Sequence, residues 1–154
     1  MKILLLGKSG QVGWELQRSL APLGQVIALD RAGITSQAAQ SRGMTCINTS
    51  LCGDLNDLLG LEKTIHALQP DIIVNAAAYT AVDKAEAESD LARRTNTEAP
   101  CVLAQAARKA GSLLVHYSTD YVFNGSGDAH WKETDSTGPL NVYGQTKLGR
   151  GSCR

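Results

Sequence analysis

The chain has 154 residues, of which 43% are hydrophobic and 19% charged, enough for one domain with a real core and too few for two ordinary domains. Its 15 basic residues balance its 15 acidic ones, which argues against the basic surface of a nucleic-acid-binding protein. No stretch approaches the roughly 20 apolar residues that a membrane-spanning helix needs. The composition therefore predicts neither a nucleic-acid partner nor a membrane span.

Four short apolar runs are expected to be strands: Ile3 to Leu6, Val26 to Leu29, Ile72 to Val74, and Leu113 to Val115. They are continuous rather than alternating, which is typical of strands that are buried on both faces of a parallel sheet. A further short strand is expected near Met44 to Ile47, within the polar stretch 31–53.

Helical patterns lie between these runs, at residues 11–23, 55–68 and 88–110. In the first of them Val12, Leu16, Leu20 and Leu23 fall on one face, and the last is rich in alanine. Strands that alternate with helices predict right-handed βαβ units with helices on both sheet faces. We therefore expect an α/β fold, a doubly wound and mostly parallel sheet of the Rossmann type.

A glycine group follows the first run and opens the first helical pattern. Gly7 suits a tight turn, Gly10 leaves room for a pyrophosphate, and Gly13 lets the helix pack closely on the strand. Lys8 lies within the loop, but the spacing differs from that of a P-loop. The group predicts a dinucleotide site, and the alternative is an ordinary glycine-rich turn.

The end of the second run carries two opposite charges. Asp30 stands where a carboxylate would accept hydrogen bonds from an adenosine ribose, which favours NAD. Arg31 comes next, and a guanidinium there would favour a 2′-phosphate. The pair leaves the cofactor preference open, and both side chains could instead be a solvated strand end.

Tyr143 and Lys147 are four residues apart, so they share one face of a helix. A tyrosine with a pKa of about 10 is a poor acid at neutral pH unless a cation stands beside it. Thr119 follows the fourth run, at the edge where open α/β sheets bind ligands. These residues predict acid–base chemistry on a carbonyl, although each could also be an ordinary helix-surface or strand residue.

The four cysteines form no CxxC pair and the three histidines are scattered along the chain. We therefore expect no metal site. Free thiols in a reducing cytoplasm are the expected state of the cysteines.

Four ordered segments resemble one known family: residues 7–16, 75–86, 118–123 and 139–148, the last reading Pro-Leu-Asn-Val-Tyr-Gly-Gln-Thr-Lys-Leu. The chain is similar in them to the extended short-chain dehydrogenase/reductases that act on dTDP-sugars. The resemblance implies that NADPH, or often NADH, reduces the 4-keto group of dTDP-4-dehydro-β-L-rhamnose to give dTDP-L-rhamnose. Magnesium and a homodimer are compatible with the resemblance, but no residue indicates either.

The resemblance also implies roles for individual residues. Tyr143 would act as the general acid, Lys147 would lower the pKa of that tyrosine and hold the nicotinamide ribose, and Thr119 would hydrogen-bond the carbonyl. Asp120 would contact the sugar. The residues expected to line the cofactor are Gly7, Gly10, Gln11, Val12, Gly13, Asp30, Asp54, Leu55, Ala78, Tyr79, Thr80, Tyr117, Tyr143 and Lys147.

Residues 1–148 are expected to be the dinucleotide-binding domain, and residues 149–154 a divergent tail with two glycines that disfavour a helix. The substrate domain of the family is expected to be absent, so little turnover is expected from this chain alone. The alternatives are a non-catalytic dinucleotide-binding or regulatory protein, and a marginal fragment with an exposed sheet edge.

Overall fold

The computed structural model describes residues 1–35 and 50–149, and the strand expected near residues 44–47 lies outside them. The sheet has four parallel strands, β1 (Lys2–Leu6), β2 (Gln25–Leu29), β3 (Ile72–Asn75) and β4 (Leu113–His116), in the order β2-β1-β3-β4. The four expected strands are therefore confirmed, each to within a residue or two. Strand order reverses at β1, which opens a crevice at the carboxyl ends of β1 and β3.

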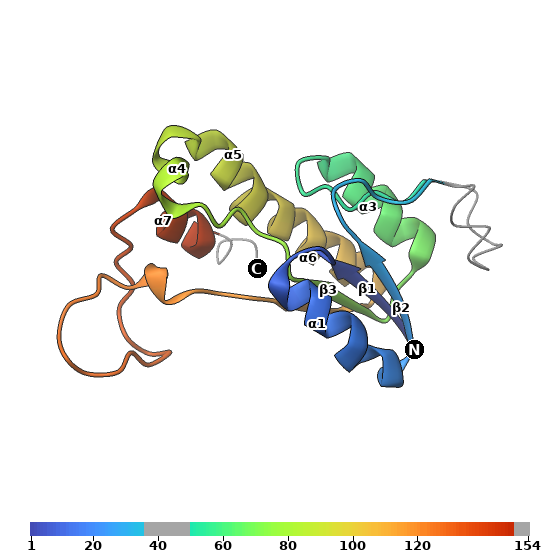
Figure 1. Cartoon of the computed structure of the whole chain (residues 1–154), viewed down its shortest axis with the longest axis horizontal. Helices are drawn as coiled ribbons and strands as arrows, with labels where there is room; N and C mark the ends of the chain where they lie inside the picture. Colours follow the sequence, from blue (N-terminus) through green and yellow to red (C-terminus); the bar gives the residue numbers. More distant parts are fainter. Residues whose placement is uncertain (36–49, 150–154) are drawn as a thin grey trace.

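Helices cover both faces of this sheet, as Figure 1 shows, with α1 on one side and α3 and α6 on the other. The doubly wound Rossmann-type fold is thus confirmed. The helical elements are α1 (Gln11–Leu20), η1 (Ala21–Leu23), α3 (Leu58–Leu68), α4 (Val82–Ala87), α5 (Ser89–Arg93), η2 (Arg94–Glu98), α6 (Ala99–Ala110), η3 (Asp120–Val122) and α7 (Val142–Gly149).

Successive side chains of β1 build two separate cores, because they point to opposite faces of the sheet. Leu4 and Leu6 join the larger cluster, which includes Leu103 of α6 and residues of α3. Ile3 and Leu5 join the smaller one, against which Leu16 and Leu20 of α1 are packed. The continuous apolar run in β1 is therefore explained by burial on both faces.

The fourth strand is less buried than the sequence pattern predicts. In β4, Leu113 is 60% and Val115 38% exposed, so burial on both faces is wrong there. The strand has a single hydrogen-bonded neighbour, β3, and it stands at the edge of the sheet. One of its faces is consequently open within the described part of the chain.

The apolar face expected over residues 11–23 is also only partly buried. Val12 and Leu23 are 47% and 57% exposed, whereas Leu16 and Leu20 pack on the sheet. The α-helix ends at Leu20, and the chain continues as a short 3₁₀ turn that contains Pro22. The change of helical period at this point moves Leu23 off the buried face.

The helices expected over residues 55–68 and 88–110 also differ from the predictions, one in its first residue and the other in its continuity. The helix expected from residue 55 begins at Leu58, because the side chain of Asp57 caps it by accepting a hydrogen bond from the Gly60 amide at 2.9 Å. The pattern over 88–110 is interrupted by a π-turn at Arg94–Glu98. Pro100, which has no N–H to donate to that turn, follows directly.

The expectation of free thiols is wrong for Cys101, which is disulfide-bonded, while Cys52 carries a free thiol. Within residues 1–35 and 50–149, no helix has the length and apolar character that crossing a membrane would require.

Candidate functional site

The turn from β1 into α1 depends on two glycines. Gly7 has φ of 88°, in the left-handed region that other residues rarely adopt. A Cβ at Gly13 would stand 2.0 Å from the carbonyl oxygen of Gly7, so only glycine lets α1 approach the strand end this closely. At Gly10 the nearest atom would be 3.5 Å away, and the space beside it is open. The three glycines therefore have the geometry that the sequence predicts.

The first turn of α1 faces outward from this loop. Gln11 and Val12 are both exposed there, next to Gly10. Backbone amides at a helix N-terminus attract anionic groups such as phosphates. The two residues are thus accessible, as a role beside a pyrophosphate would require, and that role stays a prediction.

Asp30 follows β2 and lies beside the glycine loop, because Leu29 pairs in register with Leu6. Its Oδ2 accepts a hydrogen bond from the Ser9 hydroxyl at 3.1 Å and lies 3.3 Å from the Lys8 Nζ, while Oδ1 accepts from the Ala32 amide at 3.2 Å. Partial burial raises the pKa of the Asp30 carboxyl, but the hydrogen bonds from Lys8 and Ser9 and the charge of Lys8 outweigh it, so the pKa lies below its ordinary value. The carboxylate is held in its ionised form.

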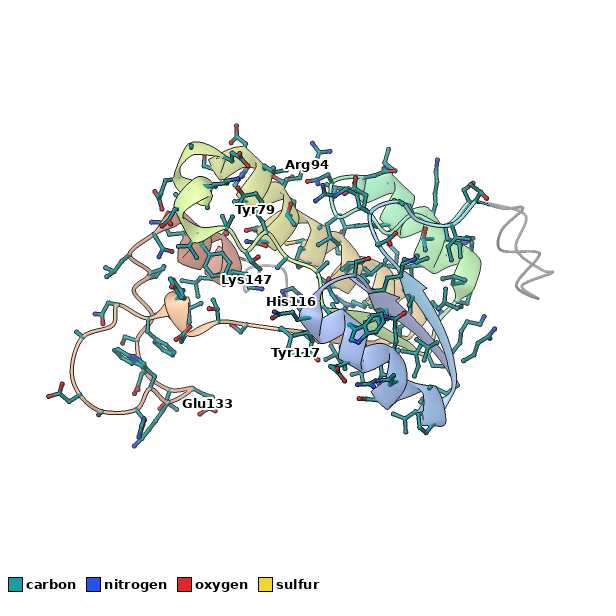
Figure 2. All side chains as sticks on the ribbon, in the orientation of Figure 1. Tyr79, Arg94, His116, Tyr117, Glu133 and Lys147 are labelled. Atoms are coloured by element: carbon teal, nitrogen blue, oxygen red, sulfur yellow. The ribbon has the colours of Figure 1, made fainter. Side chains whose placement is uncertain are left out.

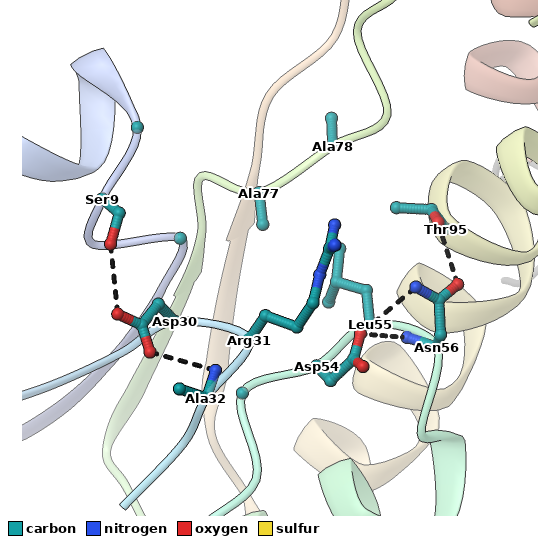
Figure 3. Close-up of a pocket in the computed structure, with 13 residues that line it drawn as sticks. Ser9, Asp30, Arg31, Ala32, Asp54, Leu55, Asn56, Ala77, Ala78 and Thr95 are labelled. Carbon is teal, nitrogen blue, oxygen red and sulfur yellow. Dashed lines mark hydrogen bonds between the residues drawn. The ribbon is translucent and has the colours of Figure 1, made fainter.

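A cleft of about 410 Å³ opens at the carboxyl ends of β1, β2 and β3 (Figure 3). Arg31 extends across it and reaches above Leu55, while Asp30 points away toward the glycine loop. The residues that line the cleft are Gly7, Ser9, Gly10, Asp30, Arg31, Ala32, Gly53, Asp54, Leu55, Asn56, Ala77, Ala78 and Thr95.

The far wall of the cleft is built around Asp54. Its Oδ1 accepts hydrogen bonds from the backbone and side-chain nitrogens of Asn56, at 2.9 and 3.2 Å. The Asn56 side chain in turn accepts from the Thr95 hydroxyl at 3.2 Å, which ties this loop to the π-turn η2. Leu55, between them, is 4% exposed and presents an apolar surface. The wall is therefore fixed by side-chain hydrogen bonds rather than by a strand or helix.

Beyond β3, Ala77 and Ala78 line the cleft, and the chain then continues through Tyr79 and Thr80. The Asn96 side chain holds this segment from η2, accepting from the Tyr79 amide at 2.9 Å and donating to the Tyr79 carbonyl at 3.0 Å. The Tyr79 hydroxyl donates to Glu88 at 2.7 Å, which raises the pKa of the phenol. Thr80 is exposed.

A second cavity, of about 850 Å³, lies where the chain leaves β4, and both Thr119 and Lys147 line it. The Thr119 hydroxyl donates to Asp120 at 3.2 Å and accepts from the Tyr121 amide at 3.3 Å, which starts the short η3 helix. Tyr117, two residues earlier, is 42% exposed. The structure thus brings Thr119 and Asp120 to the same edge as Lys147.

Helix α7 supplies Tyr143 and Lys147. Lys147 is 3% exposed and its ammonium donates to the Tyr117 carbonyl at 2.9 Å, so the helix is linked to the end of β4 (Figure 2). The Tyr143 ring packs edge-on against Tyr121, with ring centroids 5.5 Å apart. A Cβ at Gly144 would stand 2.2 Å from the Tyr121 carbonyl oxygen, which shows how closely α7 lies on η3.

Two further hydrogen bonds connect α7 with η2. The same Asn96 amide that holds Tyr79 donates to the Thr146 hydroxyl at 3.2 Å, and Thr97 donates to the Thr146 carbonyl at 2.6 Å. Asn96 is 1% exposed. A buried amide therefore joins the segment beside the first cavity to the helix of Tyr143.

The sequence did not indicate every residue that this arrangement uses. Lys8 was noted only as evidence against a P-loop, yet it pairs with Asp30. Ser9, Asn56 and Thr95 also went unnoticed, because single polar residues in loops carry no pattern of their own. In the described residues no group of three or more His, Cys, Asp or Glu side chains is placed to hold a metal ion.

Comparison with known proteins gives consistent matches. A family model described as the RmlD substrate binding domain matches residues 1–151. A dTDP-4-dehydrorhamnose reductase of Salmonella typhimurium is 53% identical over 148 residues, which cover 96% of this chain and 44% of the relative. This chain therefore spans less than half the length of that relative.

Two solved structures share the fold over nearly the whole chain. A hypothetical dTDP-4-dehydrorhamnose reductase from Sulfolobus tokodaii superposes with a TM-score of 0.82 at 37% identity, covering 99% of this chain and 51% of that one. A dTDP-4-dehydrorhamnose reductase from Bacillus anthracis, solved in complex with NADP, gives 0.81 at 29% identity, covering 99% and 48%. From its sequence and its fold alike, the chain belongs to the family of the RmlD substrate binding domain.

Proposed function

We propose that this chain is the dinucleotide-binding half of a reductase that converts dTDP-4-dehydro-β-L-rhamnose into dTDP-L-rhamnose with NADPH. The observation that carries the proposal is the pair of cavities along one edge of the sheet. One is lined by the glycine loop and the Asp30 carboxylate, and the other by Thr119 and the buried Lys147. The names of the relatives, and the NADP bound to one of them, support the same reading.

The residues of the first cavity fit a dinucleotide. The open space at Gly10 and the amides that begin α1 suit a pyrophosphate, and Asp30, which lines the same cleft, is proposed to bind the ribose. Asp54 and Leu55 line the part of the cleft proposed for the adenine, and Ala78, Tyr79, Thr80 and Tyr117 continue toward the nicotinamide. When bound, NADPH would supply the hydride.

Thr119 and Lys147, which line the second cavity, are proposed to handle the proton together with Tyr143, which lies one turn before Lys147 on α7 and does not itself line the cavity. The Tyr143 hydroxyl would donate a proton to the oxygen of the reduced carbonyl, and Lys147, one helical turn further along α7, would hold the nicotinamide ribose. Thr119, with Asp120 beside it, would hydrogen-bond the carbonyl oxygen and orient it. We propose a cytoplasmic location, where nucleotide sugars and NADPH are used, while magnesium and a homodimer stay predictions of the resemblance.

We assign residues 1–148 to the dinucleotide-binding domain. The Salmonella relative is more than twice the length of the region matched here, and the extra length would supply contacts to the nucleotide-sugar. Binding energy from parts of the substrate remote from the carbonyl is what an enzyme uses to lower its barrier. The 154-residue chain alone should therefore bind NADPH while turning over little substrate.

The proposal is tested by two measurements. Titration calorimetry of the 154-residue chain should show saturable NADPH binding. Residues 1–148 joined to the remaining part of the Salmonella relative should reduce dTDP-4-dehydrorhamnose, and Tyr143→Phe in that fusion should lower turnover at least about 100-fold with NADPH affinity kept.

Tyr121→Phe is the matched control, because it removes the same hydroxyl from the ring that packs against Tyr143. Turnover by this variant should stay within about twofold of the parent. Equal loss in both variants, or turnover that survives Tyr143→Phe, would contradict the assigned proton donor. A folded fusion that binds NADPH but shows no turnover would favour a non-catalytic dinucleotide-binding protein.

A further inference from the structure

The end of β2 gives contradictory indications about the cofactor. An acid at this position normally accepts hydrogen bonds from the adenosine ribose and repels a 2′-phosphate, which selects NAD. Here Asp30 occupies the position, but Arg31 follows it, and Lys8 of the glycine loop is paired with it. How these three charges are placed in space decides which cofactor the site accepts.

The charge of Asp30 is already compensated. Lys8 lies 3.3 Å from Oδ2, and Ser9 and the Ala32 amide engage the same carboxylate at 3.1 and 3.2 Å. Lys8 and Asp30 are 27% and 29% exposed, so water screens the pair only in part. A phosphate that approached this edge would therefore meet a nearly neutral pair instead of a bare carboxylate.

Arg31 is placed differently. No hydrogen bond or ion pair within the described residues holds its guanidinium, and Figure 3 shows it extended into the cleft rather than toward Asp30. It lines the same cavity as Asp30 and Ser9. A guanidinium can bind a phosphate through two parallel hydrogen bonds, which makes it a suitable partner for a 2′-phosphate.

We propose that Lys8 and Arg31 together let this chain bind the 2′-phosphate of NADPH although Asp30 stands at the position that ordinarily excludes it. Lys8 acts indirectly, by cancelling the repulsion from Asp30, and Arg31 acts by direct contact. The inference rests on the proposed cofactor site and adds the residues that set its selectivity.

The experiment measures the affinities of NADPH and NADH side by side, by titration calorimetry on the 154-residue chain. The parent chain should bind NADPH at least as tightly as NADH. Arg31→Gln should weaken NADPH about tenfold more than NADH, and Lys8→Gln about three- to fivefold more. Adding Asp30→Asn to Lys8→Gln should restore the NADPH affinity, because the repulsion that Lys8 cancels is then gone.

Lys109→Gln is the control, since it removes the same charge from an ion pair with Glu62 and does not line the cleft. It should leave the ratio of the two affinities unchanged, and circular dichroism verifies that each variant is folded. If Lys8→Gln and Arg31→Gln weaken both cofactors equally, or if Asp30→Asn fails to rescue, the inference is overturned while the proposed function stands. If the folded parent binds neither cofactor, the proposed function fails and the inference with it.

Discussion

The two ends of the candidate site are built in different ways. At the first cavity, which we propose binds the adenosine part of the cofactor and call the adenosine end, Gly13 is in close contact with Gly7. The carboxylates of Asp30 and Asp54 are both held there by hydrogen bonds. At the reaction end, β4 is partly exposed and the cavity is lined largely by the loop that joins η3 to α7. Among the residues that line that cavity, Val122 and Lys147 are buried.

The difference bears on the proposed cofactor site. Groups that are fixed before binding cost little to order, so the first cavity is the part that we expect to bind a dinucleotide without further ordering. An open cavity between exposed loops offers few such groups for a nucleotide-sugar. We therefore expect changes at the adenosine end to affect folding and cofactor binding together, and changes at the reaction end to affect turnover alone.

The most severe disruption of the adenosine end should come from Gly13→Ala. The added Cβ would stand 2.0 Å from the Gly7 carbonyl oxygen, so α1 must move away from β1. We expect a loss of about 3 kcal/mol in the free energy of unfolding and at least about tenfold weaker NADPH binding. Urea unfolding and calorimetry measure the two effects.

Gly10→Ala tests whether that loss is specific to the contact. Its Cβ would meet nothing closer than 3.5 Å, so the free energy of unfolding should change by less than about 0.5 kcal/mol. Similar destabilisation by both substitutions would mean that the glycine loop is not packed as described.

Asn96→Ala should remove the hydrogen bonds that join the Tyr79 segment to helix α7. The substitution leaves the Tyr79 amide and carbonyl and the Thr146 hydroxyl without the buried side chain that bonds them. We expect a loss of about 2 to 3 kcal/mol in the free energy of unfolding, with weaker NADPH binding. Asn124→Ala, in an exposed loop, should cost less than about 0.5 kcal/mol, and equal losses would contradict a special role for Asn96.

The smallest effect concerns the protonation of Asp30. Its pKa is lowered in the folded chain, so ionised Asp30 stabilises the fold above its unfolded pKa, and this contribution disappears as the pH falls through the lower, folded pKa. Because the side chain is 29% exposed, we expect less than about 1 kcal/mol. The difference in unfolding free energy between the parent and Asp30→Asn should therefore shrink between neutral pH and about pH 3, and a difference independent of pH would contradict the ion pair.

Much of the fold could be predicted because its signals are local. Each strand is a short apolar run, and the glycine loop is recognisable from three residues between a strand and a helix. Helix α4 was not predicted. The π-turn at Arg94–Glu98 could not be predicted, because Asn96 within it bonds to Tyr79 and Thr146, which are distant in the sequence. The exposure of Leu113 and Val115 follows from strand order, which no local pattern contains.

The candidate site was predictable to a similar extent. Asp30 and Gly13 occupy positions fixed by the βαβ unit, so their placement followed from the sequence. The pairing of Lys8 with Asp30 joins residues 22 positions apart, and it depends on the register of β1 with β2. The hydrogen bonds that fix the Asp54 wall arise between loops, where sequence offers no periodicity to guide an expectation.

Thermal unfolding of the 154-residue chain with and without NADPH tests most directly whether the adenosine end is ready for its cofactor. At a concentration of about 100 times the dissociation constant, NADPH should stabilise the folded state by about 2.7 kcal/mol, a rise in Tm of roughly 5 to 10 °C. A cooperative transition with a rise of this size is the result that the account predicts. A cooperative transition whose midpoint does not change with NADPH would contradict it.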